Sequence, residues 1–411
     1  MSPRRIAVIG GGAAGFFSAL SAAEADPAAR VVIFEATAHP LAKVRISGGG
    51  RCNVTHACFE PRELVKRYPR GSRELIGPLH RFGPTETVAW YQARGVALKT
   101  EADGRMFPTT DDSGTIIDCL RSAADAAAIV VRLRMPVRAV ERSAPRGGDF
   151  QLTSGDGSIE QFHRVVVATG GNKGSGGLAI AESLGHTIEP PVPSLFTFQI
   201  EDERLRGIEG LAVPGATVTV PGTKLRETGP VLVTHWGLSG PGILRVSAWG
   251  ARELAVRGYR FVVRIAWTGE TNEDRVREAL QAGRADLARK QVHNANPLGL
   301  PGRLWERLVA AAGIGREVVW ASVSKNLLLA LSRQVAGSEF AVTGKSMNKE
   351  EFVTCGGVKL REVDFKTMQS RKCEGLYFAG EVLDIDGVTG GFNFQSAWTT
   401  GHIAGTAAAG N

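Results

Sequence analysis

The sequence contains little cysteine, and that cysteine is poorly arranged for disulfides. Its five cysteines are odd in number and irregularly spaced: Cys52, Cys58, Cys119, Cys355 and Cys373. A disulfide scaffold needs a denser, even set, so this composition argues against such a fold and indicates a reducing compartment. Pairs of Cys or His at metal-ligand spacing are missing as well, and we therefore expect no structural metal.

Long apolar runs are also missing. No stretch approaches the roughly 18 consecutive apolar residues that a membrane span needs. Residues 1–5 are followed by only a few apolar residues before Gly10, too few for the apolar part of a signal peptide. We expect a cytoplasmic protein with no membrane partner; nothing in the sequence indicates its oligomeric state.

Acidic residues are scarcer than basic ones. The chain has 49 Lys and Arg against 41 Asp and Glu, a formal net charge of +8. The excess is local, because residues 40–100 hold 11 basic against 4 acidic residues, and residues 191–340 hold 19 against 14. This distribution favours an anionic partner, although ordinary solvated surfaces give the same count.

The chain is too long for one compact core. It has 411 residues, whereas single cores stop growing near ~250–300 residues. Prolines gather at 190–193, and short β-type stretches separated by turns follow them. Between about 271 and 337, apolar residues three or four apart predict a helical subdomain. We expect one domain built from both ends of the chain and an inserted β-domain, with these segments: 1–190, 191–344 and 345–411.

A glycine-rich turn follows the first predicted strand, residues 6–9. Gly10, Gly12 and Gly15 have the spacing of the dinucleotide-binding fingerprint. The first glycine permits a tight turn, the second lets the backbone approach a pyrophosphate, and the third lets the helix pack on the strand. Ala13 and Ala14 complete this turn at the helix N-terminus.

Glu35 ends the second predicted strand, 20 residues after Gly15. A carboxylate at this place accepts hydrogen bonds from the adenosine ribose and disfavours a ribose 2′-phosphate. A third strand, residues 165–168, leads into Thr169 and Gly170, which we expect beside the bound adenosine. FAD and NAD share this fingerprint, so it leaves both cofactors open.

Further motifs resemble one family. They are found in order along nearly the whole chain, at residues 43–55, 104–108, 234–241, 380–384 and 389–393. Together they resemble the HI0933/YhiN-like family of flavoproteins. The resemblance implies FAD as cofactor and an α/β fold, in which a glutathione-reductase-type, Rossmann-like FAD domain carries an inserted β-domain with a helical subdomain.

The same motifs supply the other candidate cofactor residues. Consecutive glycines offer backbone N–H groups without side-chain bulk, and Arg51 can add charge-assisted bonds to phosphate. By resemblance, one carboxylate among Glu381, Asp384 and Asp386 bonds the ribityl hydroxyls. A last helix, from Phe394 to about Ala409, points its positive end at the flavin. These motifs add the following candidate cofactor residues to those named above: Lys43, Ser47, Gly48, Gly49, Gly50, Arg51, Asn53, Gly380, Glu381, Asp384, Gly390, Gly391, Phe392 and Asn393.

The expected chemistry is hydride transfer at the flavin. The sequence has no second dinucleotide fingerprint and no Cys-x-x-Cys pair, so the expected reductant is transiently bound NADH or NADPH, with another donor as the alternative. Cys52 and His235 are the candidate proton donors, and Arg51 is a candidate electrostatic stabiliser. A buried packing role for Cys52 and a core position for His235 are the alternatives. Trp236 is expected to cover the flavin or to lie in the core.

We expect a reductase of an activated C=C bond, with uracil in structured (ribosomal) RNA as the leading substrate. A small conjugated enone is the alternative substrate. A non-catalytic, flavin-containing RNA-binding factor would keep the basic segments without rapid reduction by NADH or NADPH. An NAD-dependent dehydrogenase would not need the C-terminal motifs.

Overall fold

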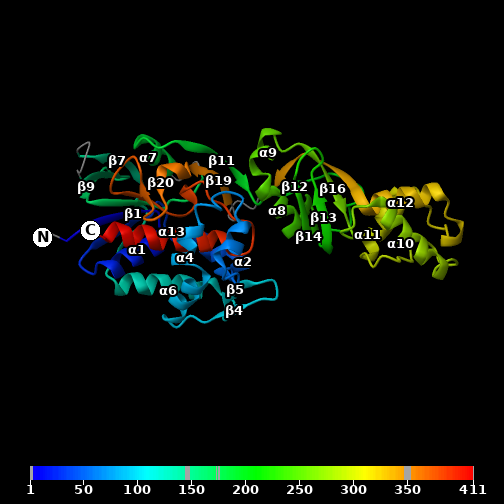
Figure 1. Ribbon diagram of the computed structural model, residues 1–411, viewed down its shortest axis with the longest axis horizontal. Coiled ribbons are helices and arrows are strands. Elements are labelled where there is room, and N and C mark those ends of the chain that lie inside the picture. The colour runs from blue at the N-terminus through cyan, green and yellow to red at the C-terminus, as the bar shows by residue number, and fades with distance from the viewer. Residues whose placement is uncertain (1–2, 144–148, 173, 175, 347–352, 411) are drawn as a thin grey trace. The chain divides into compact units, whose positions relative to one another are not determined.

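The computed structural model describes residues 3–143, 149–172, 174, 176–346 and 353–410. The chain divides into two compact units, Met1–Pro193 with Lys349–Asn411, and Ser194–Asn348. The two ends of the chain therefore share the first unit (Figure 1). Of the predicted third segment, residues 347–352 and 411 lie outside the described residues. None of the helices in the described ranges is both long and apolar enough to cross a membrane.

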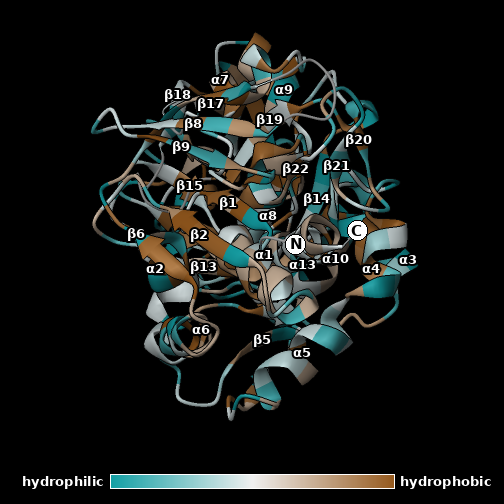
Figure 2. Ribbon diagram, turned by 90° about the vertical axis from the view of Figure 1, so that its left-hand side faces the viewer, coloured by the Kyte–Doolittle hydropathy of each residue, from teal (hydrophilic) through white to brown (hydrophobic). Residues whose placement is uncertain are grey.

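The first unit is built on a sheet that has seven strands in the described part of the chain. Their order across the sheet is β20 (Val363–Asp364), β21 (Gln369–Ser370), β22 (Leu376–Phe378), β10 (Arg164–Val167), β1 (Arg5–Ile9), β2 (Arg30–Phe34) and β6 (Val130–Arg132). Neighbours from β22 to β6 pair in parallel, and β20 and β21 add an antiparallel hairpin at the edge. The inner strands are short apolar runs, as the hydrophobic colouring of β2 shows (Figure 2), which suits a sheet covered on both faces.

Helices pack around this sheet. They are α1 (Ala13–Ala25), α2 (Ala42–Gly50), α3 (Pro61–Leu64), α4 (Ile76–Arg81), α5 (Pro84–Gln92), α6 (Ser113–Ala126), α7 (Gly177–Ser183) and α13 (Phe392–Ala409). The first and last of them, α1 and α13, lie side by side (Figure 1). Their contact is close because the facing residues are small: a Cβ on Gly405 would lie 2.0 Å from the Ser18 carbonyl oxygen.

Smaller sheets complete the first unit. They are β3 (Thr55–His56) with β5 (Arg105–Pro108) and β4 (Leu98–Thr100), then β7 (Val137–Arg142) with β8 (Phe150–Ser154) and β9 (Ile159–Phe162), and β11 (Ile188–Ser194) with β19 (Val353–Val358).

The second unit has an antiparallel sheet and a group of helices. The sheet order is β17 (Ser338–Val342), β16 (Phe261–Ala266), β13 (Ala212–Thr219), β14 (Arg226–Thr234), β15 (Gly237–Ser239), β12 (Thr197–Gln199) and β18 (Gly344–Ser346). The helices are α8 (Pro241–Trp249), α9 (Ala251–Val256), α10 (Glu273–Asp286), α11 (Gly302–Ala311) and α12 (Lys325–Gly337). Trp267, Trp305 and Trp320 are fully buried in one core shared by strands and helices.

The predicted fold class is confirmed: a parallel, Rossmann-like sheet carries an inserted antiparallel β-domain with helices. Some element ends differ from the prediction. The last helix begins at Phe392, two residues before the predicted Phe394. Strand β14 runs from Arg226 to Thr234 and is longer than the short β-type stretches expected in this domain, because it pairs with the full length of β13.

Candidate cofactor site

Gly10, Gly12 and Gly15, the three glycines of the first turn, have different structural surroundings. Gly10 has a φ of +111°, and a Cβ there would lie 2.5 Å from the Ala168 carbonyl oxygen. A Cβ on Gly15 would lie 1.9 Å from the Gly10 carbonyl oxygen, whereas one on Gly12 would meet no atom within 4 Å. Packing therefore demands glycine at positions 10 and 15. At position 12 glycine leaves open space beside the N-terminus of α1.

That space faces the start of a helix that no described side chain caps. Gly12 is the N-cap residue of α1 and has no side chain to offer, and Ala13 and Ala14 are the first helical residues. The N–H groups of a helix's first turn have no partner within the helix, and they carry a partial positive charge. The turn can thus accept a pyrophosphate.

Glu35 lies where the fingerprint requires it. Its Oε2 accepts the Gly11 N–H at 2.8 Å, and its Oε1 accepts the Thr37 N–H at 2.7 Å. These bonds fix the carboxylate against the turn. The Thr37 hydroxyl also donates to Oε1, at 2.7 Å, so about one of the roughly four acceptor sites of the carboxylate is left for a ribose hydroxyl.

The second glycine-rich segment is not a regular helix, although it closes α2. Helical backbone ends before Ser47, whose ψ is 149°, and Gly48, Gly49 and Gly50 have φ values of 59°, 69° and 84°. A Cβ on Gly48 would lie 2.9 Å from the Phe107 ring, whereas one on Gly49 or Gly50 would meet nothing within 4 Å. The segment is thus a left-handed loop with open space along its glycines.

Arg51 follows this loop and is held by carboxylates. Its Nη1 lies 2.6 Å from Glu101 Oε1 and 3.5 Å from Asp111 Oδ1, and its guanidinium lies 4.0 Å from the centre of the Phe107 ring. The hydrogen bond to Glu101 raises the pKa of Arg51. Any contact between Arg51 and a phosphate would have to compete with this ion pair.

Cys52 is fully buried with a φ of 59°. Burial raises the pKa of its thiol to about 12, so the thiol stays protonated at neutral pH. The next residue, Asn53, joins this segment to the last helix. With its amide oriented to satisfy both ends, its oxygen accepts the Gly391 N–H at 2.9 Å and its nitrogen donates to the Thr55 carbonyl at 3.0 Å.

Glu381 and Lys43 form an ion pair at the carboxyl end of the sheet. Lys43 Nζ lies 2.5 Å from Glu381 Oε2, and Glu381 Oε1 accepts the Thr354 N–H at 3.1 Å. A Cβ on Gly170, in the turn that Thr169 begins after β10, would lie 4.0 Å from Glu381 Oε2. Gly380 is in contact with α1, because a Cβ there would lie 2.7 Å from that of Ala14. The fold thus brings four distant candidate segments together.

The acidic residues after β22 have different environments. Asp384 is 8% exposed and Asp386 is completely buried. Asp386 receives two hydrogen bonds from the guanidinium of Arg70. Because the Glu381 side chain is 17% exposed and Asp384 is 8% exposed, whereas Asp386 is closed off, Glu381 and Asp384 remain the candidates for the ribityl hydroxyls.

A glycine turn and its side-chain bonds define the start of α13. Gly390 and Gly391 have φ values of 135° and 89°. Asn393 folds back over the turn: its Oδ1 accepts the Gly387 N–H at 2.8 Å and its Nδ2 donates to the Gly387 carbonyl at 2.9 Å. Phe392 is buried, and its carbonyl accepts the Tyr68 hydroxyl at 2.6 Å.

His235 and Trp236 belong to the second unit, in the turn between β14 and β15. Both side chains are exposed, so neither is a core residue. Trp236 Nε1 donates to Thr197 Oγ1 at 3.0 Å. The alternative that placed His235 in the core is wrong, because the turn projects it into solvent.

A buried polar network was not foreseen from the sequence. Gln395 is completely buried; its Oε1 accepts the hydroxyls of Thr55 at 2.6 Å and Thr87 at 3.1 Å, and its Nε2 donates to Thr399 Oγ1 at 3.0 Å. It ties β3 and α5 to the second turn of α13. The polar residues of the last helix were the only signal for this network in the sequence. Their partners Thr55 and Thr87 lie 340 and 308 positions before Gln395, so the sequence alone did not identify them.

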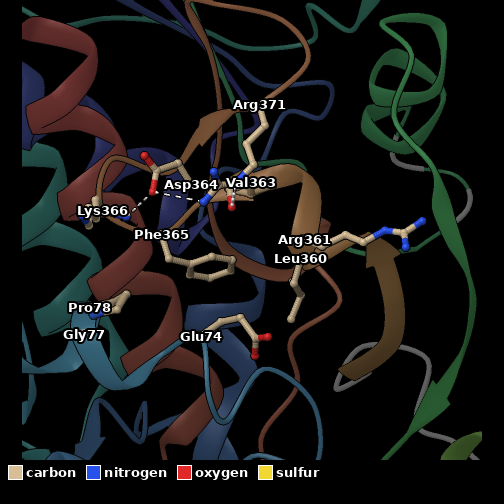
Figure 3. Close-up of a pocket in the computed structure, with 10 residues that line it drawn as sticks. All are labelled: Glu74, Gly77, Pro78, Leu360, Arg361, Val363, Asp364, Phe365, Lys366 and Arg371. Atoms are coloured by element: carbon tan, nitrogen blue, oxygen red, sulfur yellow. Dashed lines mark hydrogen bonds and ion pairs between the residues drawn. The ribbon is translucent and has the colours of Figure 1, made fainter.

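A separate pocket of about 450 Å³ lies between α4 and the β20–β21 hairpin (Figure 3). Its lining residues are Glu74, Gly77, Pro78, Leu360, Arg361, Val363, Asp364, Phe365, Lys366 and Arg371. None of the candidate cofactor residues lines it. Within the described ranges, no three His, Cys, Asp or Glu side chains gather as they would around a metal ion.

The residues present at the sheet's carboxyl end fit FAD. Open space beside the α1 N-terminus suits the pyrophosphate, Glu35 suits the adenosine ribose, and the carboxylates after β22 suit the ribityl chain. The fold and these turns define an FAD-dependent oxidoreductase.

The chain belongs to the HI0933-like family, because residues 4–407 match the HI0933-like protein Rossmann domain. This confirms the predicted family. The chain is 31% identical to the ribosomal RNA dihydrouridine synthase of Escherichia coli (strain K12) over 403 residues, which cover 96% of this chain and 95% of the relative. It is 28% identical to the 3-dehydro-bile acid delta(4,6)-reductase of Clostridium scindens over 413 residues, 98% and 99% of the two chains.

A solved structure shows the same fold. The 3-ketosteroid delta1-dehydrogenase from Sterolibacterium denitrificans matches all of this chain, and is matched over its whole length, with a TM-score of 0.54 and 12% sequence identity.

Proposed function

We propose that this protein reduces the ring C=C bond of uracil in structured RNA, ribosomal RNA foremost, with NADH or NADPH as the electron donor. The observation that carries this proposal is the 31% identity, over 95% or more of both chains, to a protein named as a ribosomal RNA dihydrouridine synthase. Bound FAD would take two electrons from the nicotinamide and pass them on as a hydride.

Unpaired surface cations support an RNA substrate. Of the 11 basic residues in 40–100, several are ion-paired, but five exposed arginines have no carboxylate partner within the described residues: Arg45, Arg62, Arg67, Arg73 and Arg81. Cations of this kind can contact phosphates without reading sequence, and such binding weakens as salt rises. A target uracil would also have to leave its stack to react.

The reduction needs a proton as well as a hydride. Hydride addition to one carbon of the uracil C=C bond is completed by a proton on the neighbouring carbon, and His235 and Cys52 are the candidate donors. The His235 side chain is exposed to solvent, whereas Cys52 is fully buried and burial raises the pKa of its thiol to about 12. We propose His235 as the donor. Removing the true donor should slow reduction of the substrate roughly 10²–10⁴-fold and leave reduction of the flavin unchanged.

A small conjugated enone is the second candidate substrate. It is favoured by the 28% identity, over nearly the full length of both chains, to a reductase of a 3-dehydro-bile acid. Such a substrate would not need the exposed arginines.

The deciding experiment compares the dihydrouridine content of ribosomal RNA from cells with and without the gene. We expect its loss in the deletion strain and its return with the wild-type gene. In parallel, Arg62→Gln with Arg73→Gln should weaken binding of an rRNA fragment and flatten its salt dependence. Lys66→Gln is the matched control, because Lys66 is already paired with Glu63 at 2.7 Å. Unchanged dihydrouridine would exclude the RNA substrate and leave the enone.

A further inference from the structure

A short segment before α4 runs alongside the turn that precedes α13. The Val388 N–H donates to the Arg67 carbonyl at 2.9 Å, and Arg70 and Asp386 pair as an isolated antiparallel bridge. Gly71 has a φ of +80°, and a Cβ there would lie 2.6 Å from the Ile385 side chain. We call residues 67–71 the strap, because they lie against the turn along its length.

An ion pair fastens the strap to the turn. Arg70 donates through Nε and Nη2 to the two carboxylate oxygens of Asp386, and the side chains are 12% and 0% exposed. A pair of this kind fixes orientation, since two parallel N–H···O bonds allow one relative placement. Removing either side chain breaks both of these bonds at a site that is almost completely buried, where loss of an ion-pair partner is costly.

Tyr68 makes a second connection, directly to the helix. Its side chain is 1% exposed, and its hydroxyl donates to the Phe392 carbonyl at 2.6 Å. The ring also packs against the turn, where a Cβ on Gly387 would lie 3.3 Å from it. The strap therefore determines where the first turn of α13 stands.

We infer that Arg70, Asp386 and Tyr68 are positioning residues that hold the α13 N-terminus against the flavin. The inference rests on the proposed use of that helix end toward the cofactor. The partial positive charge of a helix N-terminus acts within about one turn, so a small displacement weakens its stabilisation of negative charge on the reduced cofactor. None of the three residues needs to touch the flavin.

The test replaces Asp386 with Asn and measures FAD affinity and reduction potential on the purified holoprotein. We expect FAD to bind at least tenfold more weakly and the potential to become more negative. Glu362→Gln is the control: Glu362 is also a buried carboxylate, 7% exposed and paired with Lys372 at 2.8 Å, but it contacts neither the strap nor the turn. The control should lose stability with the potential unchanged.

A second variant keeps the test decisive if Asp386→Asn fails to fold. Tyr68→Phe removes one hydroxyl and preserves the shape of the ring, and we expect a smaller change of potential in the same direction. Equal potentials and FAD affinities in wild type, Tyr68→Phe and every folded Asp386 variant would overturn the inference. Both readouts are taken without substrate, so a protein with the expected shifts but no activity on RNA would contradict only the proposed function.

Discussion

The two helix N-termini of the candidate cofactor site, those of α1 and α13, are held in place in different ways. The turn before α1 is fixed mainly by its neighbours in sequence, because Gly10, Gly15 and Glu35 lie within 26 positions and contact one another directly or through Gly11, and only the Ala168 carbonyl beside Gly10 comes from a distant strand. The turn before α13 is fixed from a distance, since Asp386 is paired with Arg70, 316 positions earlier in the chain. The turn before α1 is therefore set mostly by local sequence, whereas the turn before α13 depends on contacts that exist only in the completed fold.

The two turns are nevertheless joined. Small residues let α1 and α13 pack at backbone distance, and a Cβ on Gly401 would lie 2.7 Å from the Ala14 carbonyl oxygen. Displacing α13 would therefore disturb the first turn as well. Because the two turns are coupled in this way, removing or altering one of them at a time should show how far each depends on the other.

The largest effect is expected from removing the C-terminal part of the first unit, which contains α13 and the turn before it. Residues 1–190 contain the complete first turn but lack β22 and α13, so β10 keeps β1 but loses its other parallel partner, and α1 loses the helix it packs against. We predict that this fragment is insoluble on expression and binds no FAD. A soluble fragment that binds FAD would show that the first turn suffices alone.

Substitutions within the first turn should separate folding from cofactor binding. Gly15→Ala forces Cβ onto the Gly10 carbonyl oxygen and should destabilise the fold by roughly 3 kcal/mol. Gly12→Val places its side chain in open space, so we expect a folded protein that fails to retain FAD. Thermal unfolding and the flavin absorption spectrum measure the two effects. A yellow Gly12→Val protein would contradict the assignment of that space to the pyrophosphate.

The sequence was sufficient for the first turn and for the fold class. Glycine spacing, an acidic residue at the end of the next strand and short apolar runs are the local signals that predict the first turn, and the family resemblance implies the fold class. The partners of Arg51, the Gln395 network and the strap could not be predicted from the sequence. Those contacts join residues 50 to 340 positions apart, and each needs the folded chain to bring opposite charges or buried polar groups together.

A smaller effect is expected at Glu35. Glu35→Ala removes the acceptor for the ribose and for the Gly11 N–H, and should weaken FAD binding by about 1–3 kcal/mol. Titration of the apoprotein with FAD measures this change. If affinity falls no more than in an exposed control such as Glu63→Ala, the ribose role is wrong.

An effect that is absent at neutral pH should appear away from both turns, as a loss of stability in acid. Burial alone would raise the pKa of Glu362, but hydrogen bonds from Lys372 and the Thr187 N–H lower it to about 2. A depressed carboxylate pKa stabilises the fold above the unfolded value of about 4.5, and this stability is lost as pH falls toward 2. Burial also lowers the pKa of His186, so protonation of the unfolded state reduces stability below about 6.5.

Denaturant unfolding at several pH values measures this acid sensitivity. Glu362→Gln should remove roughly 1–3 kcal/mol of the difference between neutral pH and pH 3. An unaltered pH dependence in that variant would assign the acid loss to other groups.

The most direct test of the account is made on the purified, anaerobically reduced protein. Ribosomal RNA from the deletion strain and a small conjugated enone are each added, and return of the oxidised flavin spectrum is followed together with product formation. We predict that the RNA restores the yellow colour rapidly, with one dihydrouridine formed for each flavin reoxidised, and more slowly as salt is raised. Reoxidation by the enone alone, with no dihydrouridine in the RNA, would contradict the account.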